Sequence, residues 1–99
     1  MTNDTLIVLC TCPDEASAEG IATALVEARL AACVNLLPQV RSIYRWEGRL
    51  EHSNEWLLLI KTGAKRYTAL EQLIRELHPY ELPEVIAVPV HTGLTDYLR

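Results

Sequence analysis

The sequence predicts an α+β fold, one domain in the order strand, helix, strand, strand, helix, strand. Two segments carry apolar residues at helical spacing, and four others have the composition or the alternation of strands. Gly48 stands between two long strand-like segments, where a hairpin turn is required. The 99 residues suffice for one hydrophobic core and are too few for two, so residues 1–99 are expected to form a single domain.

The first strand is expected at residues 5–12, because TLIVLCTC favours a strand and ends at Pro13. Pro13 suits the first position of a helix, and Asp14 and Glu15 follow where a helix start favours negative charge. Helical spacing then continues, which predicts a helix to about Leu30. The apolar positions of this pattern are Ala18, Ile21, Ala22, Leu25 and Ala32.

A long hairpin is expected in the middle of the chain. Residues 33–47 alternate between two faces, which predicts the second strand. Gly48 supplies the turn, and residues 49–62 form the third strand, which ends in the apolar run 56–60.

The second helix and the last strand complete the pattern. The helix is predicted from the spacing of Tyr67, Leu70, Leu73, Ile74 and Leu77. It is expected to end at His78, because a residue that precedes proline is pushed out of the helical region. The fourth strand is expected at residues 84–91, EVIAVPVH.

This order of elements is that of the ferredoxin-like fold, an antiparallel sheet in the order 4-1-3-2 with both helices on one face. Pro38 and Pro89 fall in the two edge strands of that order, where a missing amide hydrogen is tolerated. The prolines are therefore consistent with the predicted topology.

The two expected helices cover only one face of the sheet. The first, third and fourth strands nevertheless carry apolar residues at consecutive positions, at 6–9, 57–60 and 85–88, as strands buried on both faces do. Another copy of the chain is the simplest cover, so we expect an oligomer. The alternative is a twisted monomer with an open apolar face.

Charge and composition exclude several classes of partner. The net charge is −4 and the nine Lys and Arg residues are scattered along the sequence, so nucleic acid is not expected as a partner. No apolar run approaches the length of about 18 residues that a membrane span needs. Residues 1–4 lack the positive start of a secretion signal, so we expect a cytoplasmic protein whose Cys10, Cys12 and Cys33 stay as thiols.

The predicted chain directions bring several polar residues to one rim of the sheet. There the first strand ends, the second helix ends and the fourth strand begins. The residues concerned are Cys10 or Cys12, His78, Tyr80, Glu81, Glu84 and His52. Thiolate, imidazole and carboxylate ligands suit copper or zinc, although no strong metal motif is present. Cys33 and His91 are expected at the opposite end.

Structural roles are the alternative for each of these residues. Cys10 is also expected to behave as a small hydrophobic residue, and His78 as a cap of the helix end. Glu81 and Glu84 are expected either to be solvated or to pair with arginines of another subunit, for which Arg45 and Arg49 are the candidates. The aromatic residues are expected to be packing and interface anchors. They are Tyr44, Trp46 and Trp56.

Six segments stand together in a specific order: LCT with PD at 9–14, LAACVN at 30–35, SIYRWEG at 42–48, KT at 61–62, HPYE with PE at 78–84, and DYL at 96–98. In combination they resemble the CutA family, the divalent-cation tolerance proteins, over nearly the whole chain. The resemblance implies a homotrimer, similar in architecture to the PII signalling proteins, that is associated with tolerance to copper and other divalent cations. It also implies bound copper at Cys10 and His78.

The sequence departs from the family pattern in two places. Some members have two histidines where this chain has Leu77 and His78, which removes one potential ligand. The family usually continues past Leu98 into a tryptophan and a short helix, whereas this sequence stops at Arg99.

Three classes of function fit a small domain of this topology. The first is a trimer that binds or responds to copper or other divalent cations. The alternative is a PII-like signalling or scaffold protein whose intersubunit clefts bind a small molecule or a partner protein. An enzyme is not expected, because the acylphosphatases of this topology need a glycine-rich anion loop where residues 11–15 are acidic and lack glycine.

Overall fold

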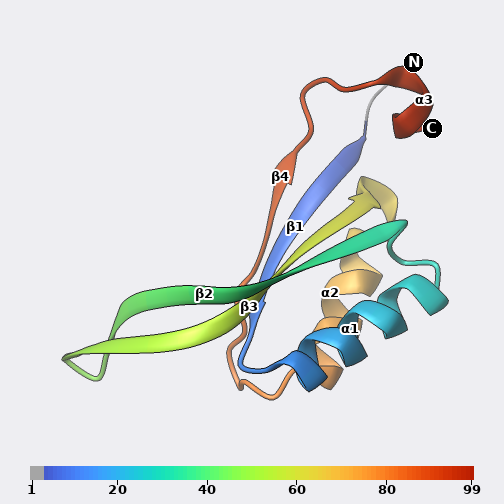
Figure 1. The fold of residues 1–99 in the computed structure, drawn as a ribbon. Coiled ribbons are helices and arrows are strands. Elements are labelled where there is room, and N and C mark those ends of the chain that lie inside the picture. The colour runs from blue at the N-terminus through green and yellow to red at the C-terminus, as the bar shows by residue number, and fades with distance from the viewer. Residues whose placement is uncertain (1–3) are drawn as a thin grey trace.

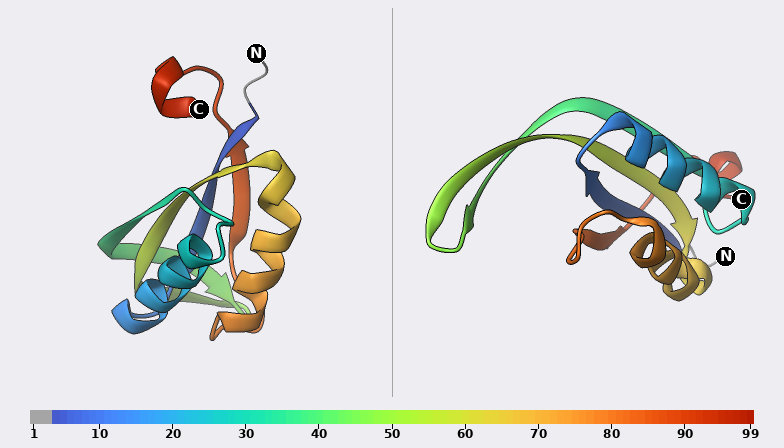
Figure 2. Two further views of the ribbon diagram at one scale, coloured as in Figure 1. Left: turned by 90° about the vertical axis from the view of Figure 1, so that its right-hand side faces the viewer. Right: turned by 90° about the horizontal axis from the view of Figure 1, so that it is seen from below.

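The computed structural model describes residues 4–99 and has the four strands and two helices in the predicted order, with a short 3-10 turn and a short last helix that were not predicted (Figure 1). The elements are β1 (Thr5–Cys12), α1 (Glu15–Glu27), β2 (Cys33–Trp46), β3 (Arg49–Gly63), the 3-10 turn η1 (Ala64–Arg66), α2 (Tyr67–Leu77), β4 (Val85–Pro89) and α3 (Thr95–Leu98). The antiparallel sheet has the order β2-β3-β1-β4, which is the predicted 4-1-3-2. Helices α1 and α2 lie on one face of it (Figure 2). The ferredoxin-like prediction is therefore confirmed.

Helix α1 begins two residues later than Pro13, so the prediction of proline at the first helical position is wrong. Asp14 is the N-cap: its backbone is extended, and its side chain accepts a hydrogen bond of 2.8 Å from the Ser17 amide. A carboxylate cap satisfies a free amide, which proline in the first turn does not do.

The end of α1 also differs from the prediction. The helix ends at Glu27 rather than near Leu30, because Arg29 adopts a left-handed backbone with φ 60°. Ala32 consequently lies outside the helix, and its amide donates to the Lys61 carbonyl.

The Asp14 cap predicts a pH-dependent stability. Its hydrogen bonds with Ser17 lower the pKa of the Asp14 carboxyl. The cap is therefore fully effective above the ordinary carboxyl pKa and is lost as the pH falls through the lowered value. An Asp14→Asn variant caps at every pH, so thermal unfolding between pH 6 and pH 2 should show the native protein losing stability relative to this variant in acid. If the melting temperatures of the two proteins change with pH in the same way over that range, the Asp14 carboxylate does not stabilise the helix start.

The β2-β3 hairpin turns at Glu47 and Gly48, which both have positive φ, at 48° and 78°. Two left-handed residues in succession form the mirror-image type I turn that matches the twist of a hairpin, and this explains the glycine. The register shifts between Leu37 and Val40, around Pro38. Pro38 and Pro89 lie on the edge strands β2 and β4, as predicted.

The outer part of this hairpin projects beyond the sheet. Strand β1 pairs with β3 only from Trp56 to Gly63, so residues 40–55 form a two-stranded arm. The arm gives the molecule its longest extent of 47 Å, and it is the part at the left of Figure 1.

The core lies between the sheet and the two helices. Val8, Cys10 and Cys12 point toward the helices and are fully buried, together with Leu58 and Ile60 on β3. The alternate residues of β1 and β3 therefore lie on the other face of the sheet, as expected for strands that are apolar on both faces. Strand β4 ends at Pro89, two residues earlier than predicted.

Candidate metal centre

Two cysteines and a histidine meet at the end of the sheet where β1 finishes. Cys10 and Cys12 are two residues apart on β1, so both side chains lie on the helix-covered face. His78 follows the last residue of α2. The two sulfur atoms and a ring nitrogen of His78 all lie within 4.8 Å of one another, and all three residues are buried. We call them the thiol–imidazole cluster.

His78 is held by hydrogen bonds at both ring nitrogens. Nε2 donates to the Thr11 carbonyl at 2.7 Å, and Nδ1 accepts from the Tyr80 amide at 3.0 Å. These partners fix a neutral ring with its proton on Nε2. A metal ion at His78 must therefore displace one of the two bonds, most simply the bond from Tyr80 to Nδ1.

The backbone explains why the histidine arrives at this place. The His78 amide still donates to the Ile74 carbonyl as the last bond of α2, and ψ of His78 is 134°. That extended value is the conformation which Pro79 imposes on the residue before it. The helix therefore stops where the imidazole faces the end of β1.

The two thiols are electrostatically linked. The hydrogen bond between them raises the pKa of Cys10, and burial raises it further. The same bond lowers the pKa of Cys12, against the effect of burial. Cys12 is consequently the first of the pair to form the thiolate that binds metal ions.

Tyr80 and Glu55 close the cluster on one side. The Tyr80 hydroxyl donates to Oε2 of Glu55 at 2.8 Å, and Glu55 is buried at the base of the arm. Burial, followed by this hydrogen bond, raises the pKa of Tyr80. Tyr80 therefore acts as a neutral donor that fastens the loop after α2 to β3.

The other residues predicted for this rim lie outside the cluster. His52 is exposed on the arm, opposite Ile43, because β3 extends beyond the end of β1. Glu81 is exposed in a shallow pocket beside α2, which Glu71 and Glu76 also line. Glu84 is exposed just before β4, and its charge contributes to the raised pKa of Cys10.

Cys33 lies at the opposite end of the sheet, as predicted. It pairs with Lys61, whose partner on β1 is Ile7.

The three predicted anchor aromatics occupy two environments. Tyr44 and Trp46 lie on the arm and are 42% and 61% exposed, and the Tyr44 hydroxyl shares a 2.7 Å hydrogen bond with Ser53. Trp56 packs against the core. An interface role for these residues stays a prediction.

Sequence reasoning left open whether Cys10 or Cys12 belongs to the site, and it missed the bonds that fix His78. The sequence does indicate that Cys10 and Cys12 belong to the same site, because residues two apart on a strand have their side chains on one face. No residue type in the sequence indicates the hydrogen bonds that fix His78, because the partners are the backbone groups of Thr11 and Tyr80.

The geometry of the cluster suits a soft metal ion. A metal–sulfur bond is about 2.3 Å long, so three ligands spread evenly around one ion lie about 4.0 Å apart. Atoms within 4.8 Å of one another need only a small contraction to share an ion. Two thiolates and an imidazole are ligands that copper and zinc accept.

Comparison with known proteins gives a consistent result. Residues 6–99 match the family described as CutA1 divalent ion tolerance protein. The chain is 53% identical over 89 residues to Protein CutA of Mus musculus, covering 90% of this chain and 50% of that protein. It is 47% identical over 95 residues to the divalent-cation tolerance protein CutA of Pectobacterium atrosepticum, covering 96% and 86% of the two chains. The chain thus spans about half the length of the mouse relative.

Solved structures agree with these matches. CutA of Xylella fastidiosa has a TM-score of 0.94 at 50% identity, with 96% of this chain and 91% of that chain covered. A protein of Archaeoglobus fulgidus that is described as periplasmic divalent cation tolerance protein CutA has a TM-score of 0.92 at 33% identity, with 95% and 91% covered.

Within residues 4–99, no helix is both long enough and apolar enough to cross a membrane.

Proposed function

The chain belongs to the CutA1 divalent ion tolerance family, and we propose that it contributes to cation tolerance by binding copper at the thiol–imidazole cluster. The observation that carries this proposal is the convergence of Cys10, Cys12 and His78, with three ligand atoms within 4.8 Å and all three residues buried. We propose binding rather than catalysis, in line with relatives that are named for tolerance.

Copper(I) is the preferred ion for this set of ligands. Structural zinc sites almost always have four ligands in a tetrahedron, whereas the cluster holds three ligand residues within the described part of the chain. Thiolates select Cu(I), which accepts two or three ligands. Zinc is the second choice, with a fourth ligand supplied from outside the cluster.

We further propose a homotrimer in the cytoplasm. The sheet face away from the helices carries Ile86 and Val88, which are 53% and 46% exposed in the single chain. Apolar surface of this kind on a sheet favours association with further copies. A reducing compartment keeps both cluster cysteines available as thiols. The alternative of a PII-like signalling role is not favoured, because the relatives are named for divalent-cation tolerance.

The proposal predicts one tight Cu(I) site for each chain. Competitive titration of the reduced protein with Cu(I) should show this site, and Cys10→Ser or Cys12→Ser should weaken it at least about a hundredfold. Loss of a group that only orients a ligand already weakens a metal site by about 10–100-fold, so loss of a ligand is expected to weaken it no less. A separate titration with Cu(II) tests the divalent ion.

Cys33→Ser is the matched control. It removes the third cysteine, which lies at the far end of the sheet and outside the cluster. The oligomeric mass of each variant is measured by light scattering, so that a loss of assembly is not mistaken for a loss of ligand. Unchanged binding in both cluster variants, or equal weakening in Cys33→Ser, would contradict a copper site here.

A further inference from the structure

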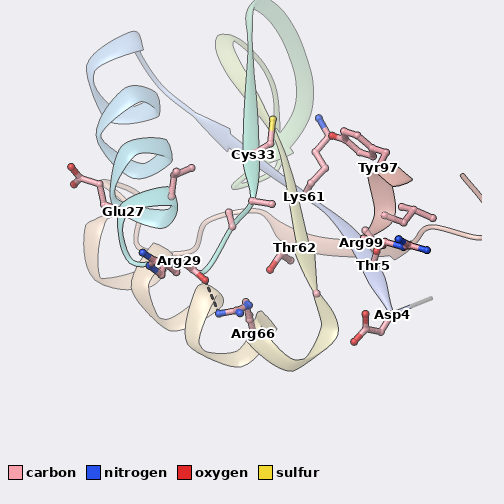
Figure 3. Close-up of a pocket in the computed structure, with 15 residues that line it drawn as sticks. Asp4, Thr5, Glu27, Arg29, Cys33, Lys61, Thr62, Arg66, Tyr97 and Arg99 are labelled. Atoms are coloured by element: carbon pink, nitrogen blue, oxygen red, sulfur yellow. Dashed lines mark hydrogen bonds between the residues drawn. The ribbon is translucent and has the colours of Figure 1, made fainter. Parts of the chain in front are cut away.

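A cavity of about 800 Å³ lies at the end of the sheet opposite the thiol–imidazole cluster (Figure 3). Its walls are the start of β1, the end of α1 with the loop that follows, the junction of β3 with η1, and α3. Neither the proposed copper site nor the exposed sheet face uses this cavity.

Basic side chains dominate the charged lining of the cavity. Four of the nine Lys and Arg residues line it, together with two carboxylates, Asp4 and Glu27. The four are Arg29, Lys61, Arg66 and Arg99. None of them forms an ion pair with another residue of the range 4–99. The basic residues are therefore scattered in the sequence, as predicted, but the fold brings four of them together. This region is positive in a protein whose net charge is −4.

Hydrogen bonds hold the part of this lining around Arg29 and Arg66 in place. The Arg66 guanidinium donates from Nη1 to the Arg29 carbonyl at 2.8 Å, which secures the left-handed residue that ends α1. The Thr62 hydroxyl donates to the Leu30 carbonyl at 2.6 Å, so the same loop is fastened to β3. A guanidinium has five N–H donors, so Arg66 keeps donors for a ligand beyond the one it uses here.

Apolar and aromatic side chains also line the cavity. They are Tyr97 and Leu98 of α3 and Val26 near the end of α1. Tyr97 is 63% exposed, and Figure 3 shows its ring beside Lys61.

We propose that this cavity binds a small organic molecule carrying two or more phosphate groups, with the phosphates on Arg29 and Arg66 and the organic part against Tyr97. Arginine binds phosphate through paired N–H donors, which makes it the usual residue for such groups. The volume falls within the range of about 300–1,000 Å³ that is common for small-molecule sites. This inference is independent of the copper proposal, because the two sites share no residue.

Calorimetric titration of the assembled protein tests it, with uridine diphosphate and inorganic pyrophosphate as probes. Uridine diphosphate should bind once per chain, pyrophosphate should compete with it, and uridine should not. Arg29→Gln and Arg66→Gln should each weaken binding about tenfold, because each removes a charge-assisted hydrogen bond. Affinity should also fall as the salt concentration rises.

Lys65→Gln is the matched control. Lys65 belongs to the same η1 turn as Arg66 and is exposed, but it does not line the cavity. Binding in this variant should equal that of the native protein, and circular dichroism of all variants should show an intact fold. The proposal is overturned if neither phosphate probe binds saturably, if uridine binds as well as its diphosphate, or if Lys65→Gln weakens binding as much as the cavity variants do.

Discussion

Replacing Ile86 by glutamate is expected to convert the proposed homotrimer into monomers. Ile86 lies on β4 opposite Leu9 of β1, and Leu9 in turn lies opposite Leu59 of β3. The three side chains form one apolar row across the sheet on the face away from α1 and α2. Such a row is the expected contact between copies of the chain.

The size of the effect follows from the two environments of residue 86. In the single chain this position is 53% exposed, so a carboxylate there stays in water and the fold tolerates it. Between copies, the same carboxylate loses its water without gaining a partner. Burying an unpaired charge costs several kcal/mol, and a symmetric assembly would bury one for each copy.

Light scattering at matched concentration measures the result. Leu82→Glu is the control, because Leu82 is 88% exposed in the loop before β4 and lies outside the apolar row. This variant should keep the native mass. If Ile86→Glu also keeps it, the exposed sheet face is not the contact between copies.

Much of the fold was predictable because its signals are local in the sequence. The order of strands followed from alternation and helical spacing, and β1 was predicted with its exact bounds. The start of α1 was not, because two adjacent residues offered competing signals. Pro13 suits a helix start, but Asp14 has the side chain that reaches the Ser17 amide, and the cap decided the boundary.

The candidate metal centre was predictable in part for a related reason. Strand and helix directions alone bring the end of β1 to the end of α2, which places Cys10 and Cys12 near His78. The directions of the strands do not, however, show how far each strand extends. The arm carries His52 beyond β1, and nothing in the alternation of β3 shows where its pairing with β1 stops.

The basic cavity lay beyond such reasoning altogether. Arg29, Lys61, Arg66 and Arg99 come from four separate segments, and no periodic pattern connects them. Basic residues that are scattered in a sequence form no continuous basic segment, but the fold can still bring them together in one site.

His78→Ala is expected to lower the free energy of unfolding of the metal-free protein by about 2–4 kcal/mol. The substitution leaves the Thr11 carbonyl without its bond to Nε2 and the Tyr80 amide without its bond to Nδ1. An unpaired buried polar group costs about 1–3 kcal/mol, and the lost ring also leaves a cavity. Denaturant unfolding with a chelator present, at a fixed protein concentration, measures the loss.

His91→Ala is the control for this stability measurement. His91 is exposed and follows β4, away from the thiol–imidazole cluster. Its loss should change the free energy of unfolding by less than about 0.5 kcal/mol, as is usual for surface positions. An equally small change in His78→Ala would show that the two hydrogen bonds of His78 contribute little to the fold.

Adding Cu(I) to the same three proteins separates the structural role of His78 from a role as ligand. An ion that binds only the folded state raises its melting temperature, and at a given ion concentration the rise grows with the logarithm of its affinity. If the His78 ring binds copper in place of accepting from Tyr80, Cu(I) should stabilise the native protein and His91→Ala strongly and His78→Ala much less. Equal stabilisation of all three would assign metal binding to the thiols alone, and His78 would then serve only to fasten the end of α2 to β1.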